Sequence, residues 1–271
     1  MKTRIISGAV GIALLAAVLW FRTTIVFNIA VGLVAALMVY ELCRAEKLEK
    51  EYLLTFTGAL FALACPILVK FYEGPAFNPY IAAAFAYIVI WQTVLLKRHK
   101  KTELGRFFAA EAYTLIIVFS MTSFSLLGKR SDGFVGLMPI ILTCLGAWVA
   151  DSGAYFAGTF LGKHKLCPDI SPKKTVEGLI GGALANAIVF AVMPLFMIAD
   201  KPVILGCIAY AVIGVICCFL GLLGDLTASL IKRDCGIKDY GNIMPGHGGA
   251  LDRFDSIIYI APFICFIFGG M

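Results

Sequence analysis

Charged residues are scarce in this sequence of 271 residues, because Asp, Glu, Lys and Arg together make up only 15% of it. Soluble globular domains usually contain about 25% of these residues. The shortage excludes a water-soluble globular protein and a disordered chain. No stretch is long and polar enough to form a separate soluble domain.

Histidine is rare, with three residues, and no two of the nine cysteines form a CxxC pair. A zinc site built from His and Cys is therefore not expected, and neither is a secreted disulfide scaffold. Most cysteines lie in apolar runs, including the adjacent Cys217 and Cys218. We interpret them as small buried apolar residues in a reducing setting.

Apolar residues, in contrast, make up 61% of the chain. A membrane-spanning helix needs roughly 20 such residues, which leaves room for about eight or nine helices. The sequence therefore predicts an all-α polytopic membrane protein with nine spans. They are Ile5–Phe21, Thr24–Leu42, Leu53–Phe71, Tyr80–Leu96, Phe107–Leu127, Phe134–Leu161, Leu179–Ile198, Val203–Gly224 and Ser256–Met271.

The basic residues predict the orientation of these spans. A cytoplasmic N-terminus places 18 of the 23 Lys and Arg residues at the inner side and leaves Arg22, Lys70, Lys129, Arg130 and Lys201 at the outer side. Inner loops of membrane proteins carry this excess of positive charge. We therefore attribute the net charge of +6 to membrane orientation and expect no nucleic-acid partner.

The chain is expected to divide into an N-terminal region, residues 1–130, with about five spans, and a C-terminal region, residues 131–271. The C-terminal region contains two cytoplasmic loops, 162–178 and 227–255, that are longer than a connection requires. Both loops are rich in Gly, Lys, Asp and His. Any chemistry is expected there and at the helix ends that meet them.

The second loop is flanked by carboxylates. Asp225, Ser229 and Lys232 share one helix face at the i, i+4, i+7 spacing, and Asp252 and Asp255 share a face at the predicted start of the ninth span. Carboxylates from two helix ends at one membrane surface can converge on a hard cation that also binds phosphate. The alternative is that Asp252 and Asp255 only cap a helix and that Lys232 is an ordinary anchor.

Between these carboxylates lie Gly241 and the turn Pro245–Gly249. Glycine lets the backbone approach an anion closely. His247, in this turn, is the one histidine that we expect near a substrate. His99 and His164 lie in basic loops and are expected at the solvated surface.

The first loop ends in Ser171–Gly178. Ser171 at the N-cap and Pro172 at the first helical position predict the start of the seventh span. Lys173 and Lys174 would then lie in the first turn, where the helix dipole favours an anion. A bound polyphosphate would explain the two lysines, and simple membrane orientation is the alternative.

Acidic residues inside spans are functional candidates by default. Asp151 lies in the inner half of the sixth span, where it either positions a ligand or makes a hydrogen bond between helices. Glu41 lies near an inner helix end and Glu111 in the first turn of its helix. We assign neither glutamate to chemistry.

Taken together, these elements resemble the phosphatidate cytidylyltransferase (CDP-diacylglycerol synthase) family. The family signature is matched in order and spacing by Ser229, Lys232–Arg233, Lys238–Asp239, His247–Gly249 and Asp252–Asp255. The segments Asp151–Tyr155 and Ser171–Gly178 also resemble family segments. The specific similarity extends from Trp148 to Asp255, whereas the first five spans match only as generic apolar helices.

The resemblance implies transfer of a cytidylyl group from CTP to phosphatidic acid in the bilayer, giving CDP-diacylglycerol and pyrophosphate. It implies Mg²⁺ on Asp225, Asp252 and Asp255, with a second cation left open, and an active site facing the cytoplasm at the cell inner membrane. The oligomeric state is open between a monomer and a homodimer. The implied catalytic residues are Asp225, Asp252, Asp255, Lys232, Arg233, Lys238, Asp239 and His247. The implied substrate-binding residues are Asp151, Tyr155, Ser171, Lys173, Lys174, Glu177, Ser229, Gly248, Gly249 and Arg253.

Two other functions stay open as alternatives. One is cytidylyl transfer to another lipid phosphate, such as an ether lipid. The other is an ion-coupled transporter that uses Asp151 and Asp225, although the long inner loops disfavour it. A CDP-alcohol phosphotransferase is disfavoured because the sequence has no Asp-Gly-x-x-Ala-Arg segment.

Overall fold

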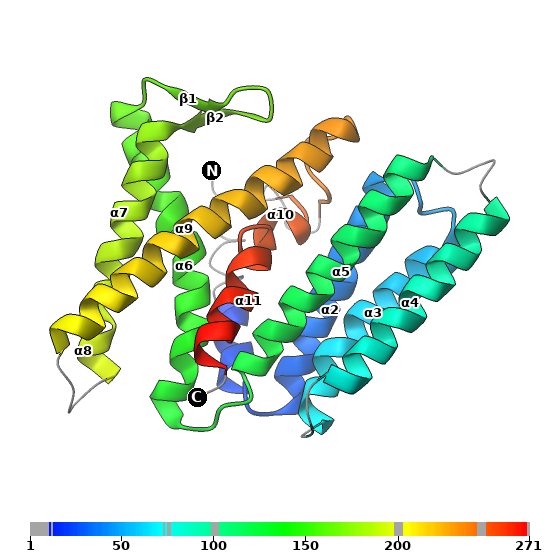
Figure 1. Ribbon diagram of the computed structural model, residues 1–271, viewed down its shortest axis with the longest axis horizontal. Helices are drawn as coiled ribbons and strands as arrows, with labels where there is room; N and C mark the ends of the chain where they lie inside the picture. The colour runs from blue at the N-terminus through cyan, green and yellow to red at the C-terminus, as the bar shows by residue number, and fades with distance from the viewer. Residues whose placement is uncertain are drawn as a thin grey trace. The chain divides into compact units, whose positions relative to one another are not determined.

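The computed structural model describes residues 11, 13–72, 74, 77–98, 103–197, 203–242 and 248–269. Residues 13–20 are mostly helical. The labelled elements in Figure 1 are α2 Ile25–Ala45, α3 Tyr52–Phe71, α4 Phe77–Arg98, α5 Leu104–Leu127, α6 Gly133–Leu161, β1 Lys165–Cys167, β2 Ser171–Thr175, α7 Val176–Val192, α8 Pro194–Met197, α9 Val203–Asp234, α10 Leu251–Phe254 and α11 Ile257–Phe268.

Within the described ranges, 7 helices are long and apolar enough to cross a membrane. They correspond to the second to eighth predicted spans, and the chain is a multi-pass, predominantly helical membrane protein. Residues 5–10 and 12 of the first predicted span lie outside the described residues, and its residues 13–20 are helical. The ninth corresponds to α11, an apolar helix of 12 residues. The nine-span count and the orientation stay predictions.

The chain forms two compact units. The first comprises Met1–Ser131 and Asp234–Phe254, and the second comprises Asp132–Arg233 and Asp255–Met271. Each unit is described by itself below.

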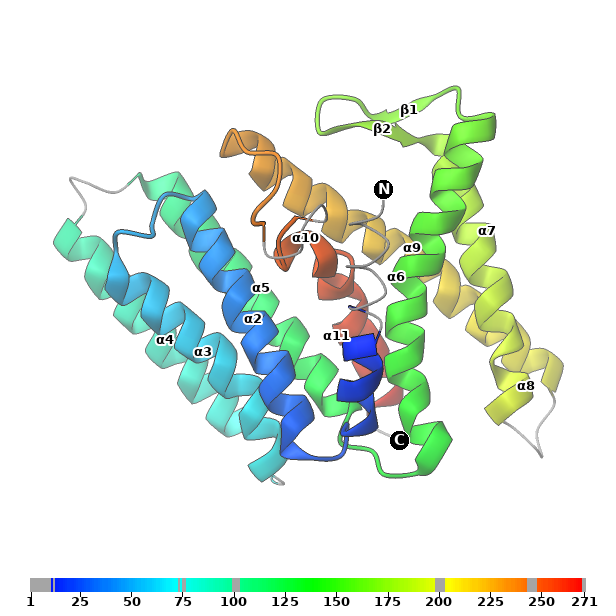
Figure 2. The same cartoon turned by 180° about the vertical axis from the view of Figure 1, so that it is seen from behind.

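The first unit contains α2, α3, α4 and α5, which run side by side in both views (Figures 1 and 2). Buried aromatic rings join three of them. Phe61 of α3 stacks on Tyr87 of α4 with ring centroids 4.9 Å apart. Trp91 of α4 lies 5.2 Å from Phe107 of α5. Such ring pairs add packing energy beyond the burial of their area.

The second unit is built on the packing of α6 against α7, which lie side by side in Figures 1 and 2. Small residues permit this close approach, because a Cβ at Gly181 would overlap the Cβ of Ala157. Asn186 of α7 ties in a third helix: its Nδ2 donates to the carbonyl oxygens of Gly146 in α6 at 2.9 Å and Gly214 in α9 at 3.1 Å.

A two-stranded hairpin precedes α7, and it corrects one prediction. β1 and β2 pair antiparallel, with Cys167 opposite Ser171. The N-cap of α7 is Thr175, whose Oγ1 accepts the N–H of Gly178 at 3.1 Å. The prediction that Ser171 caps this helix is therefore wrong, and Lys173 and Lys174 lie in a strand. Both Ser171 and Thr175 have capping side chains, and strand pairing decides between them.

The predicted start of the ninth span is also corrected. Asp252 lies in the short helix α10, which ends at Phe254, whereas Asp255 and Ser256 precede α11. A break therefore separates the two aspartates that were expected on one helix face.

The predicted position of Glu111 is corrected as well. The helix α5 begins at Leu104, so Glu111 lies about two turns inside the helix and not in its first turn.

Candidate active site

A cavity of about 260 Å³ lies in the second unit among α6, the hairpin, α7 and α9. Its apolar wall includes Ala147 of α6 and Leu222 of α9. Its polar lining contains five of the residues that the sequence singled out: Asp151, Tyr155, Ser171, Lys173 and Lys174. A cavity lined by both apolar side chains and lysines suits a molecule with an acyl part and a phosphate part.

Asp225 of α9 joins this group through Lys174, because the Lys174 ammonium forms an ion pair with Asp225 Oδ2. Ser229, one turn further along α9, donates from Oγ to Asp225 Oδ1 at 3.2 Å. The predicted shared face of Asp225 and Ser229 is confirmed. A residue of the hairpin and a residue of α9 therefore hold the same carboxylate.

Asp255 interacts electrostatically with Asp225. Its side chain is buried, and burial together with the negative charge of Asp225 raises the pKa of Asp255 to about 7. The N–H of Ser256 donates to Asp255 Oδ1 at 2.7 Å, and this bond and the Lys232 charge offset part of the rise. Gly224 lies against the Asp255 carbonyl, where a Cβ would overlap it. The close approach of α9 to Asp255 therefore requires glycine.

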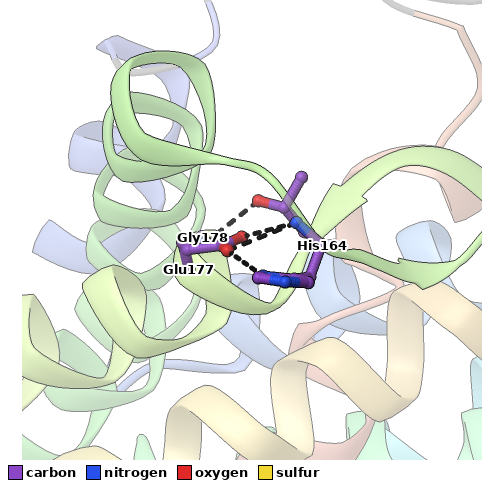
Figure 3. Close-up of polar contacts among 4 residues, drawn as sticks. His164, Glu177 and Gly178 are labelled. Atoms are coloured by element: carbon purple, nitrogen blue, oxygen red, sulfur yellow. Dashed lines mark hydrogen bonds and ion pairs between the residues drawn. The ribbon is translucent and has the colours of Figure 1, made fainter.

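Two further predicted residues contact the hairpin. Glu177 Oε1 lies 2.6 Å from His164 Nδ1, and both Glu177 oxygens accept the His164 backbone N–H at 3.2 Å (Figure 3). His164 is exposed, as expected. Arg233 Nε donates to the carbonyl oxygen of Ile170 at 3.3 Å, at the tip of the hairpin. Through these contacts, Glu177 and Arg233 hold the hairpin at residues that flank its two strands.

Asp252 lies in the first unit, where its carboxylate contacts the backbone. Its Oδ2 accepts the N–H of Tyr240 at 2.8 Å and the N–H of Gly249 at 3.0 Å. Gly248 has a φ of +87°, which favours glycine, and a Cβ there would also meet the Asp252 carboxylate. The carboxylate therefore organises the end of the glycine-rich turn.

The other predicted residues of this segment are Lys238, Asp239 and Arg253, and all three are exposed. His247 lies outside the described residues.

Glu41 of α2 also contacts this segment, and its role was not predicted from the sequence. Its side chain is 1% exposed, and its two oxygens accept the N–H groups of Ala250 and Leu251. A signal was present, because an acidic residue lies inside the predicted span Thr24–Leu42. Its partners, more than 200 residues away, gave no local signal.

The donors present fit a hard cation such as Mg²⁺. Among the described residues, no three acidic, His or Cys side chains form a metal-binding group by themselves. Mg²⁺ is usually bound by only one or two carboxylates, together with waters and substrate phosphates. Asp225 and Asp255 of the second unit match this pattern, since a cation would relieve the repulsion that raises the pKa of Asp255.

Comparison with known proteins decides the family. A model described as the cytidylyltransferase family matches residues 2–269. The chain belongs to this family. It is 35% identical to the phosphatidate cytidylyltransferase of Bacillus subtilis (strain 168), over 98% of this chain and 97% of the relative. It is 30% identical to the enzyme of that name from Haemophilus influenzae, over 99% of this chain and 98% of the relative. The resemblance inferred from the motifs is confirmed.

Proposed function

We propose that this membrane protein is a phosphatidate cytidylyltransferase, which transfers the cytidylyl group of CTP to phosphatidic acid. The observation that supports this most strongly is the Lys174–Asp225 ion pair beside a mostly apolar cavity, in a chain of the cytidylyltransferase family. The pair joins a phosphate-binding cation to a metal-binding carboxylate at one point.

In the proposed reaction, an oxygen of the phosphatidic acid phosphate attacks the α-phosphorus of CTP. The bond to the β-phosphate oxygen breaks, and pyrophosphate leaves with that electron pair. The attacking phosphate is already an anion, so it needs little help from a general base. The main task of the site is to bring two anions together in line.

The residues of β2 supply part of the required positive charge. Lys173 and Lys174 line the cavity from adjacent strand positions and are proposed to bind CTP phosphates. Lys174 already neutralises Asp225 and can contact a phosphate from the same place. Tyr155 and Asp151, which line the cavity from α6, are proposed to shape the substrate position.

Asp225 and Asp255 of the second unit are proposed to hold Mg²⁺. A metal-binding role for Asp252 depends on the family resemblance. When bound, the ion supplies charge neutralisation for the phosphates and for the leaving pyrophosphate. The proposed roles of Lys232, Lys238, Asp239, His247 and Arg253 depend on the family resemblance.

The proposed location is the cell inner membrane, with the active site and N-terminus facing the cytoplasm. The basic loop residues support this orientation. CTP would reach the hairpin from the aqueous side, and the lipid would enter the cavity from the bilayer.

The test is pyrophosphate release by the purified protein in phospholipid vesicles that contain CTP and Mg²⁺. We expect release to require both phosphatidic acid and Mg²⁺. A panel of lipid phosphates identifies the acceptor. If turnover is higher with an ether-lipid phosphate than with phosphatidic acid, the ether lipid is the substrate and phosphatidic acid is not. No release with any lipid phosphate would contradict cytidylyl transfer itself.

A further inference from the structure

Two side chains of α2, Glu41 and Arg44, hold the backbone of the segment that contains Asp252. Glu41 Oε1 accepts the N–H of Ala250 at 3.1 Å, and Oε2 accepts the N–H of Leu251 at 2.9 Å. Arg44 Nη2 donates to the carbonyl oxygen of Tyr240 at 2.6 Å. Because residues i and i+3 share a helix face, one turn of α2 fixes this segment at two points.

The surroundings of Glu41 fit its carboxylate closely. The side chain is 1% exposed, and a Cβ at either Gly241 or Gly249 would overlap its oxygens. A buried carboxylate is costly unless it is hydrogen-bonded, and here two backbone N–H groups supply the bonds. Two glycines of the loop therefore make room for an acid that comes from the second predicted span.

The peptide groups held by α2 adjoin those that hold Asp252. Asp252 accepts the N–H of Gly249, the neighbour of Ala250. It also accepts the N–H of Tyr240, the residue whose carbonyl oxygen binds Arg44. The hydrogen bonds that Asp252 accepts from Tyr240 and Gly249 therefore come from backbone that α2 fixes in place.

We propose that Glu41 is a positioning residue for Asp252, assisted by Arg44. This inference rests on the proposed function, in which the Asp252 carboxylate serves cytidylyl transfer. It gives the N-terminal region a part in the reaction: α2 sets the angle at which Asp252 is presented. A capping role for Glu41 at α10 would use the same contacts but would not affect Mg²⁺ or turnover.

The first part of the test measures the contact without using activity. Glu41→Gln keeps one acceptor oxygen but turns an NH₂ group toward the second N–H, so one of the two bonds is lost. Hydrogen–deuterium exchange of the peptide covering residues 248–256 should become about tenfold faster, as expected for the loss of a hydrogen bond to a carboxylate. The matched control is Glu111→Gln, a second buried glutamate, which is bonded to Gln92 in α4. It should leave this exchange unchanged.

The second part measures the consequence for the reaction. In vesicles with CTP and phosphatidic acid, Glu41→Gln should raise the Mg²⁺ concentration for half-maximal activity by about tenfold, the effect of losing an outer partner of a metal ligand. The melting temperature should match that of Glu111→Gln. Arg44→Gln removes the hydrogen bond to the Tyr240 carbonyl oxygen and should raise the Mg²⁺ concentration for half-maximal activity by a smaller factor. This variant provides the test if Glu41→Gln does not fold.

The outcomes separate the two proposals. Unchanged exchange in Glu41→Gln, with an active wild type, contradicts the positioning role alone. A second outcome also overturns the inference: Glu41→Gln shows faster exchange, but its Mg²⁺ dependence and kcat equal those of the Glu111→Gln control. Glu41 would then be only a capping residue of α10. A wild type that turns over no CTP, with the exchange effect present, contradicts the proposed function.

Discussion

Asp225 and Glu177 of the second unit differ from Glu41 and Asp252 of the first unit in the groups that they bind. In the second unit, Asp225 pairs with the Lys174 side chain, and Glu177 contacts the His164 side chain as well as its backbone N–H. In the first unit, Glu41 and Asp252 bond to backbone N–H groups instead. The ammonium group of a lysine side chain can change rotamer to contact a bound phosphate, whereas a backbone N–H group is fixed by the fold.

This difference suggests a division of work. The second unit presents charges that can exchange partners with a substrate, and the first unit fixes the course of the loop that bears Asp252. Substitutions in the second unit should therefore change nucleotide binding and turnover strongly. Substitutions at the first unit's buried acids should act through backbone position or stability.

The largest effect is expected at the centre of the second unit. Asp225→Asn removes the negative charge that pairs with Lys174, and it should lower CTP turnover by about 10³-fold or more, as expected when a phosphoryl-transfer site loses an essential charged group. Pyrophosphate release measures the loss. Asp169→Asn, at an exposed residue of the hairpin, is the matched control. Near-normal turnover in Asp225→Asn would remove this carboxylate from the mechanism.

The two lysines of β2 allow a paired and an exposed cation to be compared within one strand. Lys174 pairs with Asp225 and is mostly buried, whereas Lys173 is exposed. Lys174→Ala should raise the KM for CTP by about tenfold or more, the scale of a hydrogen bond to a charged group. Lys173→Ala should also raise the KM, by a smaller factor of about threefold. Steady-state kinetics at saturating Mg²⁺ measures both values, and equal values would contradict separate roles for the two lysines.

Glu46 tests whether buried acids of the first unit act on stability. Its side chain is 2% exposed, and burial, with Asp234 nearby, raises the pKa of Glu46. A raised pKa means that the folded state binds the proton more tightly than the unfolded state. The contribution of Glu46 to folding stability is therefore fully present below the pKa of the unfolded state. It is lost as the pH rises through the pKa of the folded state.

Glu46→Gln should therefore be more stable than the wild type at pH 8, by about 2 °C in melting temperature. The gain should disappear near pH 4. Thermal melting in detergent at both values measures it. A variant that is less stable at pH 8 would show that the ionised carboxylate is stabilising.

The smallest effect is expected at the exposed contact between His164 and Glu177. Exposed ion pairs contribute little, so His164→Ala should change the KM for CTP by less than about twofold. The backbone bond from the Val176 N–H to the His164 carbonyl oxygen, at 2.9 Å, does not depend on the His164 side chain. A loss of turnover as large as that of Asp225→Asn would place His164 in the reaction.

The sequence predicted the helices well, because each long apolar run has to bury its backbone polar groups within one segment. The predicted Leu53–Phe71 and Phe134–Leu161 differ from α3 and α6 by one residue at the start. The predicted apolar span ends at Gly224, ten residues before the end of α9, but the i, i+4, i+7 spacing of Asp225, Ser229 and Lys232 predicted that the helix continues. The hairpin was missed because Ser171 and Pro172 together imitate a helix start.

For the candidate site, the motifs identified the residues around the cavity but not the contacts that position Asp252. Spacing on one helix predicted the pair of Asp225 and Ser229. No local pattern could reveal that Glu41 binds residues 250 and 251, because that contact depends on long-range packing of α2 against the loop.

The most direct test of the central claim follows the label of α-phosphate-labelled CTP in vesicles that contain phosphatidic acid and Mg²⁺. The account predicts that the label appears in CDP-diacylglycerol, with one pyrophosphate released for each labelled lipid. Label that stays in water-soluble nucleotides, while phosphatidic acid is not consumed, would contradict it.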